Sequence, residues 1–259
     1  MNLSRVTPPA RYLPSPELLK ERVILVTGAG QGLGRVAALA FARHGASVIL
    51  HGRHVPKLEG VYDAIVSENL EQPAILPLDF SKTTQPELDA FAQAIHTTFG
   101  RLDGIFHGAS HFVSPMPMAL SDLEMWRKHT STNLAVPAAL TKACMPMLKR
   151  SDAASVVFLT ETHALLPKAY WGPFAVTKSA LSTLVAILAD ESSAGGPRFN
   201  LYLPGPVASP MRAQSHPGEL ASALPSAEKL APDFLYLIGR DSLAVNGCLL
   251  ESTSHKAEI

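Results

Sequence analysis

The most informative feature of the sequence is a glycine-rich segment near its beginning. The β-branched and aliphatic run 23–27 leads directly into Gly28-Ala29-Gly30-Gln31-Gly32-Leu33-Gly34, and a helical pattern follows. Glycine permits a tight turn and a close approach of backbone N–H groups, while the positive end of the next helix stabilises an anion. The order of strand, glycine loop and helix therefore predicts a nucleotide site, and a turn that is merely tight is the alternative.

A basic residue follows the second predicted strand, where many nucleotide-binding folds present an acid. The sequence Leu50-His51-Gly52-Arg53-His54 contains no carboxylate that would accept a ribose hydroxyl. A guanidinium at Arg53 can instead pair with a 2′-phosphate. We therefore expect NADP as the cofactor in preference to NAD, and a surface arginine without this role is the alternative.

The elements that must position these residues follow a regular pattern. Short apolar runs alternate with longer helical ones, which is typical of βαβ units on a parallel sheet. We expect one α/β Rossmann domain over residues 21–259, a doubly wound parallel sheet of about seven strands, after an irregular, proline-containing N-terminal arm over 1–20. The expected strands are 23–27, 47–51, 74–78, 104–107, 155–159, 198–203 and 247–251, and the expected helices are 34–44, 58–69, 85–99, 122–149 and 176–191.

The composition limits which classes of binding partner are expected. The chain has 259 residues, 47% of them hydrophobic, which suffices for one substantial core. Lysine plus arginine equals aspartate plus glutamate at 22 each, so no global positive field attracts nucleic acid or anionic lipid, and a small-molecule substrate fits better. Cys144 and Cys248 show no metal or redox spacing, and no signal peptide or membrane-spanning run is evident. These features predict a soluble, cytoplasmic protein without a metal site.

The pattern Thr27-Gly28-x-x-x-Gly32-x-Gly34 resembles the fingerprint of the short-chain dehydrogenase/reductase family, and the resemblance extends from Glu21 to about Glu251. It implies that Asp79 after the third strand contacts the adenine side and that Asn133 orders an active-site water. It also implies cofactor contacts after the fourth and sixth strands. The cofactor-binding residues are then expected to be Gly28, Gly30, Gln31, Gly32, Leu33, Gly34, Arg53, Asp79, Phe80, Gly108, Lys178, Pro204, Gly205, Val207 and Ser209.

The chain departs from this family at its catalytic positions. The family's Tyr-x-x-x-Lys is replaced by Phe174-Ala175-Val176-Thr177-Lys178, so the lysine is kept and the proton-donating phenol is lost. The family's serine lies thirteen residues earlier, and 174 minus 13 gives Glu161. An ionised carboxylate there would repel a developing alkoxide unless it is protonated. The family's Asn-Ala-Gly after the fourth strand is Gly108-Ala109-Ser110.

Other side chains are candidates for the missing donors. Tyr170, four residues before Phe174, is the first substitute, and Glu161, His111 and His163 should lie on loops at the same sheet edge. A one-residue shift of the loop would let Thr160 or Thr162 take the role of the serine. His107 and His111 have the spacing of helical metal ligands but belong to a strand end and a loop, so we do not expect zinc.

Two functions stay open on these residues. One is an NADP(H)-dependent oxidoreductase that transfers hydride to an unknown small-molecule carbonyl or enone, with the proton from water, Tyr170 or a loop acid. The other is a catalytically inactive, nucleotide-binding pseudoenzyme that acts as a sensor or partner subunit. The resemblance further implies a homodimer or homotetramer through 122–149 and 176–191. An apolar stripe there, equally compatible with packing on the sheet, consists of Leu181, Leu184, Val185 and Leu188.

Overall fold

The central strands are buried on both faces, which is why their sequences are almost continuously aliphatic and aromatic. In the computed structural model, which describes residues 3–9, 11–192 and 195–252, all strands belong to one parallel sheet with the order β1-β8-β7-β6-β5-β2-β3-β4. The strands are β1 (Ser4–Val6), β2 (Val23–Thr27), β3 (Ser47–His51), β4 (Ala74–Ile75), β5 (Gly104–His107), β6 (Ser155–Leu159), β7 (Arg198–Leu203) and β8 (Cys248–Glu251).

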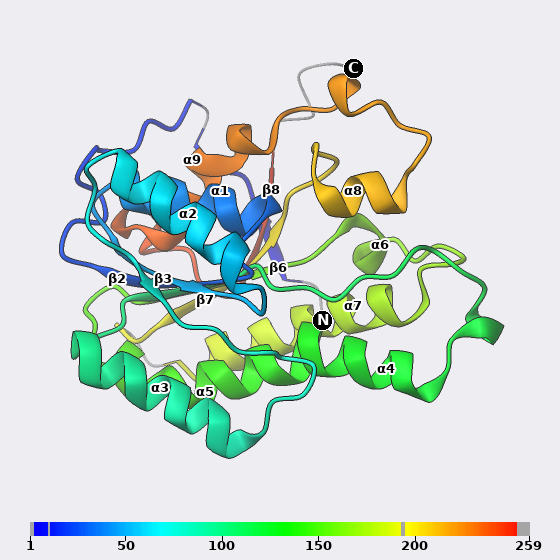
Figure 1. Ribbon diagram of the computed structural model, residues 1–259, viewed down its shortest axis with the longest axis horizontal. Helices are drawn as coiled ribbons and strands as arrows, with labels where there is room; N and C mark the ends of the chain where they lie inside the picture. Colours follow the sequence, from blue (N-terminus) through cyan, green and yellow to red (C-terminus); the bar gives the residue numbers. More distant parts are fainter. Residues whose placement is uncertain (1–2, 10, 193–194, 253–259) are drawn as a thin grey trace.

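Helices cover both faces of this sheet (Figure 1). One face carries α1 (Gly32–Arg43), α2 (Val55–Ser67) and α9 (Ala231–Ile238), and the other carries α3 (Gln85–Phe99), α5 (Val136–Leu148) and α7 (Gly172–Asp190). Two apolar cores result, one on each face, which is the arrangement of a doubly wound α/β fold. Shorter helices are α4 (Leu123–Thr130), α6 (Thr162–Leu165) and α8 (Pro210–Ser215).

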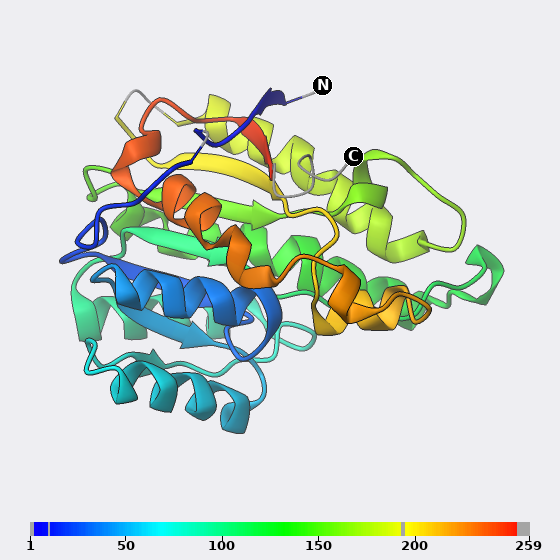
Figure 2. The same cartoon turned by 90° about the horizontal axis from the view of Figure 1, so that it is seen from above.

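The strand order reverses between β2 and β5, which are hydrogen-bonded neighbours in the middle of the sheet. From β2 the chain proceeds outward through β3 and β4, and from β5 it proceeds outward in the opposite direction. The arrowheads point toward the end of the molecule where α8 lies (Figure 2). Ligands of open α/β sheets bind at such a reversal, outside the carboxyl ends of the strands.

The expected fold class is confirmed, and the sheet has one more strand than expected. The additional strand is β1, which pairs in parallel with β8 so that Ser4 lies opposite Cys248. The description of residues 1–20 as an irregular arm was therefore wrong for this segment. Two of the three β1 residues are exposed, so the strand has no buried apolar pattern that its sequence would reveal.

The segment 122–149, expected as one helix, contains a change of helix type. A π-helical turn at Ser131–Ala135 separates α4 from α5. The bounds of α3 match the expectation because Thr84 and Glu87 form a reciprocal capping box at its start. The helix α7 begins at Gly172, earlier than expected, since Pro173 is favoured in a first helical turn.

The apolar stripe on α7 packs mainly against the core of the same molecule. Leu181 and Val185 are buried, and Leu184 and Leu188 pack partly buried against the same core. By length and composition α7 is the one helix in the described ranges apolar enough to cross a membrane, and this packing on the sheet accounts for part of its apolar character. Val176 and Ile187 stay exposed on α7, so self-association through this helix remains a prediction.

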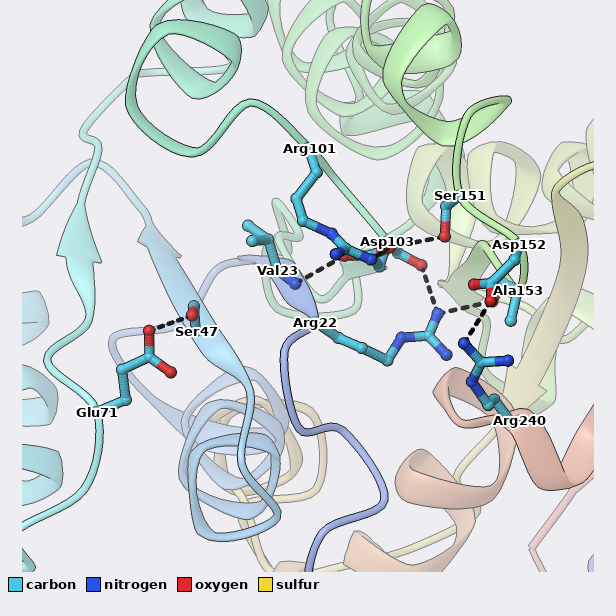
Figure 3. A network of polar contacts seen from close by, with 10 residues as sticks. All are labelled: Arg22, Val23, Ser47, Glu71, Arg101, Asp103, Ser151, Asp152, Ala153 and Arg240. Carbon is cyan, nitrogen blue, oxygen red and sulfur yellow. Dashed lines mark hydrogen bonds and ion pairs between the residues drawn. The ribbon is translucent and has the colours of Figure 1, made fainter.

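At the amino ends of β2 and β5, Asp103 connects several elements (Figure 3). Its buried carboxylate accepts from the backbone N–H of Val23 at 2.9 Å, from the hydroxyl of Ser151 at 2.7 Å and from the Nε and Nη2 atoms of Arg101 at 2.8 Å. Burial alone would raise the pKa of Asp103, but these hydrogen bonds outweigh it and lower the pKa. The carboxylate therefore connects β2 to β5 at the edge opposite the carboxyl ends of the strands.

We expect Asp103→Ala to lower the free energy of unfolding by about 3 kcal/mol, because it removes a buried charged acceptor from several donors at once. Urea unfolding measures this loss. The matched control is Glu71→Ala, which removes an exposed carboxylate bonded to Ser47 (Figure 3) and should change stability little. Equal losses in the two variants would contradict the role given to Asp103.

Candidate functional site

The glycine loop between β2 and α1 is shaped by contact with the neighbouring strand end. Gly28 has a φ of +70°, and a Cβ atom there would lie 2.7 Å from the backbone nitrogen of Ala109, which follows β5. Only glycine accommodates both the positive φ and this approach. The first turn of α1 contains no acidic residue, and Gln31 gives it no side-chain cap. Its backbone N–H groups and positive end therefore suit an anionic ligand.

A cleft of about 390 Å³ runs across the carboxyl ends of the strands. It brings together residues that the sequence separates widely. Those expected at the site that line it are Gly28, Gly30, Gln31, Gly32, Leu33, Gly34, Arg53, Asp79, Phe80, Gly108, Glu161, Phe174, Lys178, Pro204 and Ser209. Expected site residues that are not part of its lining are Asn133, Thr162, Tyr170, Gly205 and Val207.

One end of the cleft is basic. Arg53 is exposed after β3, and Lys57 lies on the first turns of α2 with its ammonium hydrogen-bonded to Gln31. The fully buried His51 is held neutral near pH 7, since burial lowers its pKa to about 4. Burial alone would raise the pKa of Asp79, but the hydrogen bonds from Ser81 and the charge of Arg53 outweigh it. This end therefore combines two cations with one ionised carboxylate.

Asn133 lies behind the cleft rather than in its wall. It occupies the π-helical turn, and its side chain accepts from the backbone nitrogen of His111 at 2.7 Å and donates to the carbonyl of the same residue at 3.0 Å. Its amide also approaches the hydroxyl of Thr177 on α7 at 3.3 Å. The buried asparagine thus fixes the loop after β5 relative to α7.

Lys178 and Glu161 are the two oppositely charged groups where the cleft meets β6 and α7. The Nζ atom of Lys178 donates to the carbonyl of Leu159 at 3.0 Å, and burial lowers its pKa to about 8. Burial also raises the pKa of Glu161, while the charges of His163 and Lys178 act in the opposite direction. The Oε1 atom of Glu161 is buried without a hydrogen-bond partner. An ionised carboxyl group at this place in the cleft therefore carries an unfavourable desolvation free energy.

Phe174 forms part of an aromatic group beside this pair. The group consists of Phe112, Trp171 and Phe174, and its members pack with ring centroids 4.9 to 6.1 Å apart. Phe112 and Phe174 line the cleft, and Met211 from α8 packs against the group. Because Phe174 is only 2% exposed and has no hydroxyl, this wall is apolar where the family's motif would place a phenol.

The structure does not bring Tyr170 to the cleft. Its side chain is 60% exposed, and its backbone adopts a φ of +77° in the loop before α7. Thr160 lines the cleft, but its buried hydroxyl points to the carbonyl of Lys178 at 3.4 Å, and Thr162 begins α6. His163 packs on Trp171 with ring centroids 4.2 Å apart. Of the substitutes considered, Glu161 and His111 line the cleft as ionisable groups.

His107 and His111, considered together for their spacing, face different surroundings. His107 is buried in the sheet core, where its Nε2 atom pairs with Thr141 at 2.9 Å and burial lowers its pKa to about 3. His111 instead approaches His129 on α4, with ring centroids 4.6 Å apart. Within residues 3–9, 11–192 and 195–252, no group of three or more His, Cys, Asp or Glu residues is arranged to hold a metal ion.

Sequence reasoning missed His129, Phe112 and Lys57, whereas Met211 begins a segment, 211–224, that the sequence already places over the substrate cleft. The buried His129 lies behind Phe174 at 6.4 Å between ring centroids, and nothing in the periodicity of α4 distinguishes it. Lys57 had a detectable signal, because it follows Arg53 by one helical turn at the same sheet edge. Phe112 depends on a loop conformation that a sequence pattern does not specify.

Lys178→Met tests the cost of the buried ammonium. The folded pKa of about 8 is lower than the ordinary 10.5, so the unfolded chain binds more protons between these values and stability due to this group rises with pH there. The difference corresponds to about 3 kcal/mol. Urea unfolding should therefore show that the free energy of unfolding of wild type rises relative to that of Lys178→Met between about pH 8 and about pH 10. A difference between the two proteins that does not change with pH would contradict this.

Comparisons with known proteins agree with the fold and the glycine loop. The family described as short chain dehydrogenase matches residues 22–220. The oxidoreductase YciK of Escherichia coli K12 is 36% identical over 241 residues, which are 93% of this chain and 95% of the relative. An A-factor type gamma-butyrolactone 1′-reductase of Streptomyces virginiae is 30% identical over 197 residues and 75% of each chain.

Solved structures extend this similarity to three dimensions. A short chain dehydrogenase from Shigella flexneri 2a, complexed with NADP, has a TM-score of 0.89 at 35% identity, covering 92% of this chain and 99% of that one. One from Escherichia coli CFT073, complexed with NADPH, has a TM-score of 0.89 at 36% identity with the same coverage. With a family match over most of its length and relatives above 30% identity, this chain belongs to the short-chain dehydrogenase family.

Proposed function

We propose that the protein is an NADP(H)-dependent oxidoreductase whose small-molecule substrate binds between the glycine loop and the aromatic group. The single observation that carries the proposal is the cleft itself, where the glycine loop, Arg53 and the buried Lys178 line one continuous surface. Relatives solved with NADP and NADPH support the same cofactor. The missing phenol at Phe174 would equally fit a catalytically inactive, nucleotide-binding protein, and measured turnover distinguishes that alternative from the oxidoreductase.

Different residues of the cleft would bind different parts of the cofactor. The N–H groups at the start of α1 would hold the pyrophosphate, and Arg53 with Lys57 would face the 2′-phosphate. Asp79 would lie beside the adenine, and Lys178 would bond the nicotinamide ribose. When bound, NADPH supplies a hydride to an electrophilic carbon of the substrate. Phe174 and its aromatic neighbours would exclude water from that carbon.

The proposal also includes an altered way of handling charge at the substrate. A phenol at position 174 would donate a proton to a carbonyl oxygen, and Phe174 has none to give. Glu161 stands where a hydroxyl would otherwise donate, and its carboxylate would oppose a growing negative charge. The substrate of the unmodified protein is therefore an activated acceptor rather than a simple ketone.

The cofactor preference is tested by titrating the purified protein with NADPH and with NADH. The fluorescence of the reduced nicotinamide reports binding. We expect NADPH to bind more tightly, and Arg53→Ala to weaken NADPH by about tenfold or more while changing NADH little, because a charged hydrogen bond is lost. The matched control is Arg150→Ala, which alters an exposed arginine at the opposite sheet edge. Equal affinities of wild type for both cofactors would refute the preference, and absence of binding would refute the oxidoreductase.

Phe174→Tyr together with Glu161→Ser should create simple ketone reduction. The tyrosine would lie one helical turn from Lys178, whose charge favours an ionisable phenol, and the serine would add a second donor. General acid catalysis contributes about 10²- to 10⁴-fold, so NADPH oxidation with a ketone should rise by at least about 10² relative to wild type. Each single variant should do less than the pair. Ordinary ketone reduction by wild type would show that the proposed alteration is wrong.

A further inference from the structure

Glu161 is the group in the cleft that an ordinary carbonyl reductase would not require. Its side chain lines the cleft with Phe174 and Lys178, and its Oε1 atom is buried without a hydrogen-bond partner. Backbone groups of His163 and Ala164 and the charge of Lys178 already favour the ionised form of Glu161, and burial opposes it. A further cation placed against the carboxyl group would offset more of the desolvation cost. A carboxyl group in this position therefore fits a ligand that brings positive charge.

The aromatic group offers a second feature of the same kind. Phe112 and Phe174 line the cleft with ring centroids 4.9 Å apart and planes inclined by 78°. Trp171 packs behind both rings. Faces of aromatic rings attract cations, above all where water is excluded. Two aromatic rings and a carboxyl group that line the same cleft suit an organic cation.

The two hydroxyl donors that the family's motif would direct at a ketone oxygen are absent from positions 174 and 161 of this cleft wall. Hydride transfer to a ketone creates an alkoxide, which needs a nearby proton donor and is repelled by a carboxylate. Phe174 has no hydroxyl, and Tyr170 lies outside the cleft. Hydride transfer to a cationic acceptor has the opposite effect, because it removes charge instead of creating it. Neither the missing phenol nor the carboxylate hinders such a reaction.

We propose that the substrate is an iminium ion, with its positive nitrogen beside Glu161 and its apolar groups against Phe112 and Phe174. This inference rests on the oxidoreductase function proposed above and names its substrate class. The hydride supplied by NADPH forms a new C–H bond at the iminium carbon. The π electron pair of the C=N bond becomes the lone pair of nitrogen. The products are a neutral tertiary amine and NADP⁺, so charge balances and no proton enters.

Lys178 is the like charge that such a substrate meets. Its ammonium is held on the carbonyl of Leu159, and burial already lowers its pKa to about 8. Lys178 therefore loses its proton more easily than an exposed lysine when a second cation binds nearby. A bound cation also favours the ionised form of Glu161, against the effect of burial on that carboxyl group.

Binding in the absence of NADPH provides the first test. The probe is an N-methyl dihydroisoquinolinium ion, and tetralone is its neutral analogue of similar shape; calorimetry measures both. We expect wild type to bind the iminium ion at least about tenfold more tightly than tetralone. Glu161→Gln should remove that difference without lowering the affinity for tetralone. Glu191→Gln, which alters an exposed carboxylate beyond the far end of α7, is the matched control and should change neither affinity.

NADPH oxidation provides the second test. Wild type should reduce the iminium ion faster than tetralone, and Phe174→Tyr with Glu161→Ser should reverse that order. Equal binding of the two probes, or an iminium affinity that Glu161→Gln leaves unchanged, would overturn the substrate class. Cofactor binding and reduction of an enone would then still support the oxidoreductase. Failure of wild type to bind NADPH would instead remove the oxidoreductase and this inference together.

Discussion

The arrangement of the cleft depends on a contact between backbones at the ends of two adjacent strands. The loop after β2 and the loop after β5 approach so closely that a Cβ atom on Gly28 would clash with Ala109, and one on Gly108 would lie 2.8 Å from the carbonyl oxygen of Thr27. This contact sets where α1 begins and how its N-terminus faces the cleft. It also places the chain after β5 so that His111 meets Asn133. The same contact between the two loops therefore positions both the start of α1 and the chain around His111.

Burial explains why the two ends of the cleft differ. At the end near Arg53 and Lys57 these cations remain solvated, so their charge is available to a phosphate at modest cost. At the end near β6 and α7, Lys178 is almost fully buried, and Glu161 keeps one oxygen unpaired. Desolvation there makes each group sensitive to the charge of what binds next to it. A small change in side chains at this end can consequently alter substrate class without altering the cofactor.

Sequence reasoning was most successful where a residue's role follows from its immediate neighbours. The glycine loop and strands such as β2, β3 and β5 have local patterns, and their bounds agree with the structure. Tyr170 shows the limit, because closeness to Phe174 in sequence did not bring its side chain into the cleft. His129 shows another, since its role depends on packing between α4 and the loop after β5. Tertiary contacts of this kind have no periodic signature.

The pairing of β1 with β8 has a consequence for the order in which the molecule is completed. Ser4 lies opposite Cys248, so β1 has no partner in the sheet until β8, which follows it far along the sequence, is in place. Closing such a long loop is entropically slow, and the rest of the sheet can assemble before it happens. Until β1 docks, β8 is an open edge to which another chain can add. Once paired, the short strand β1 covers the edge of β8 and keeps another chain from adding there.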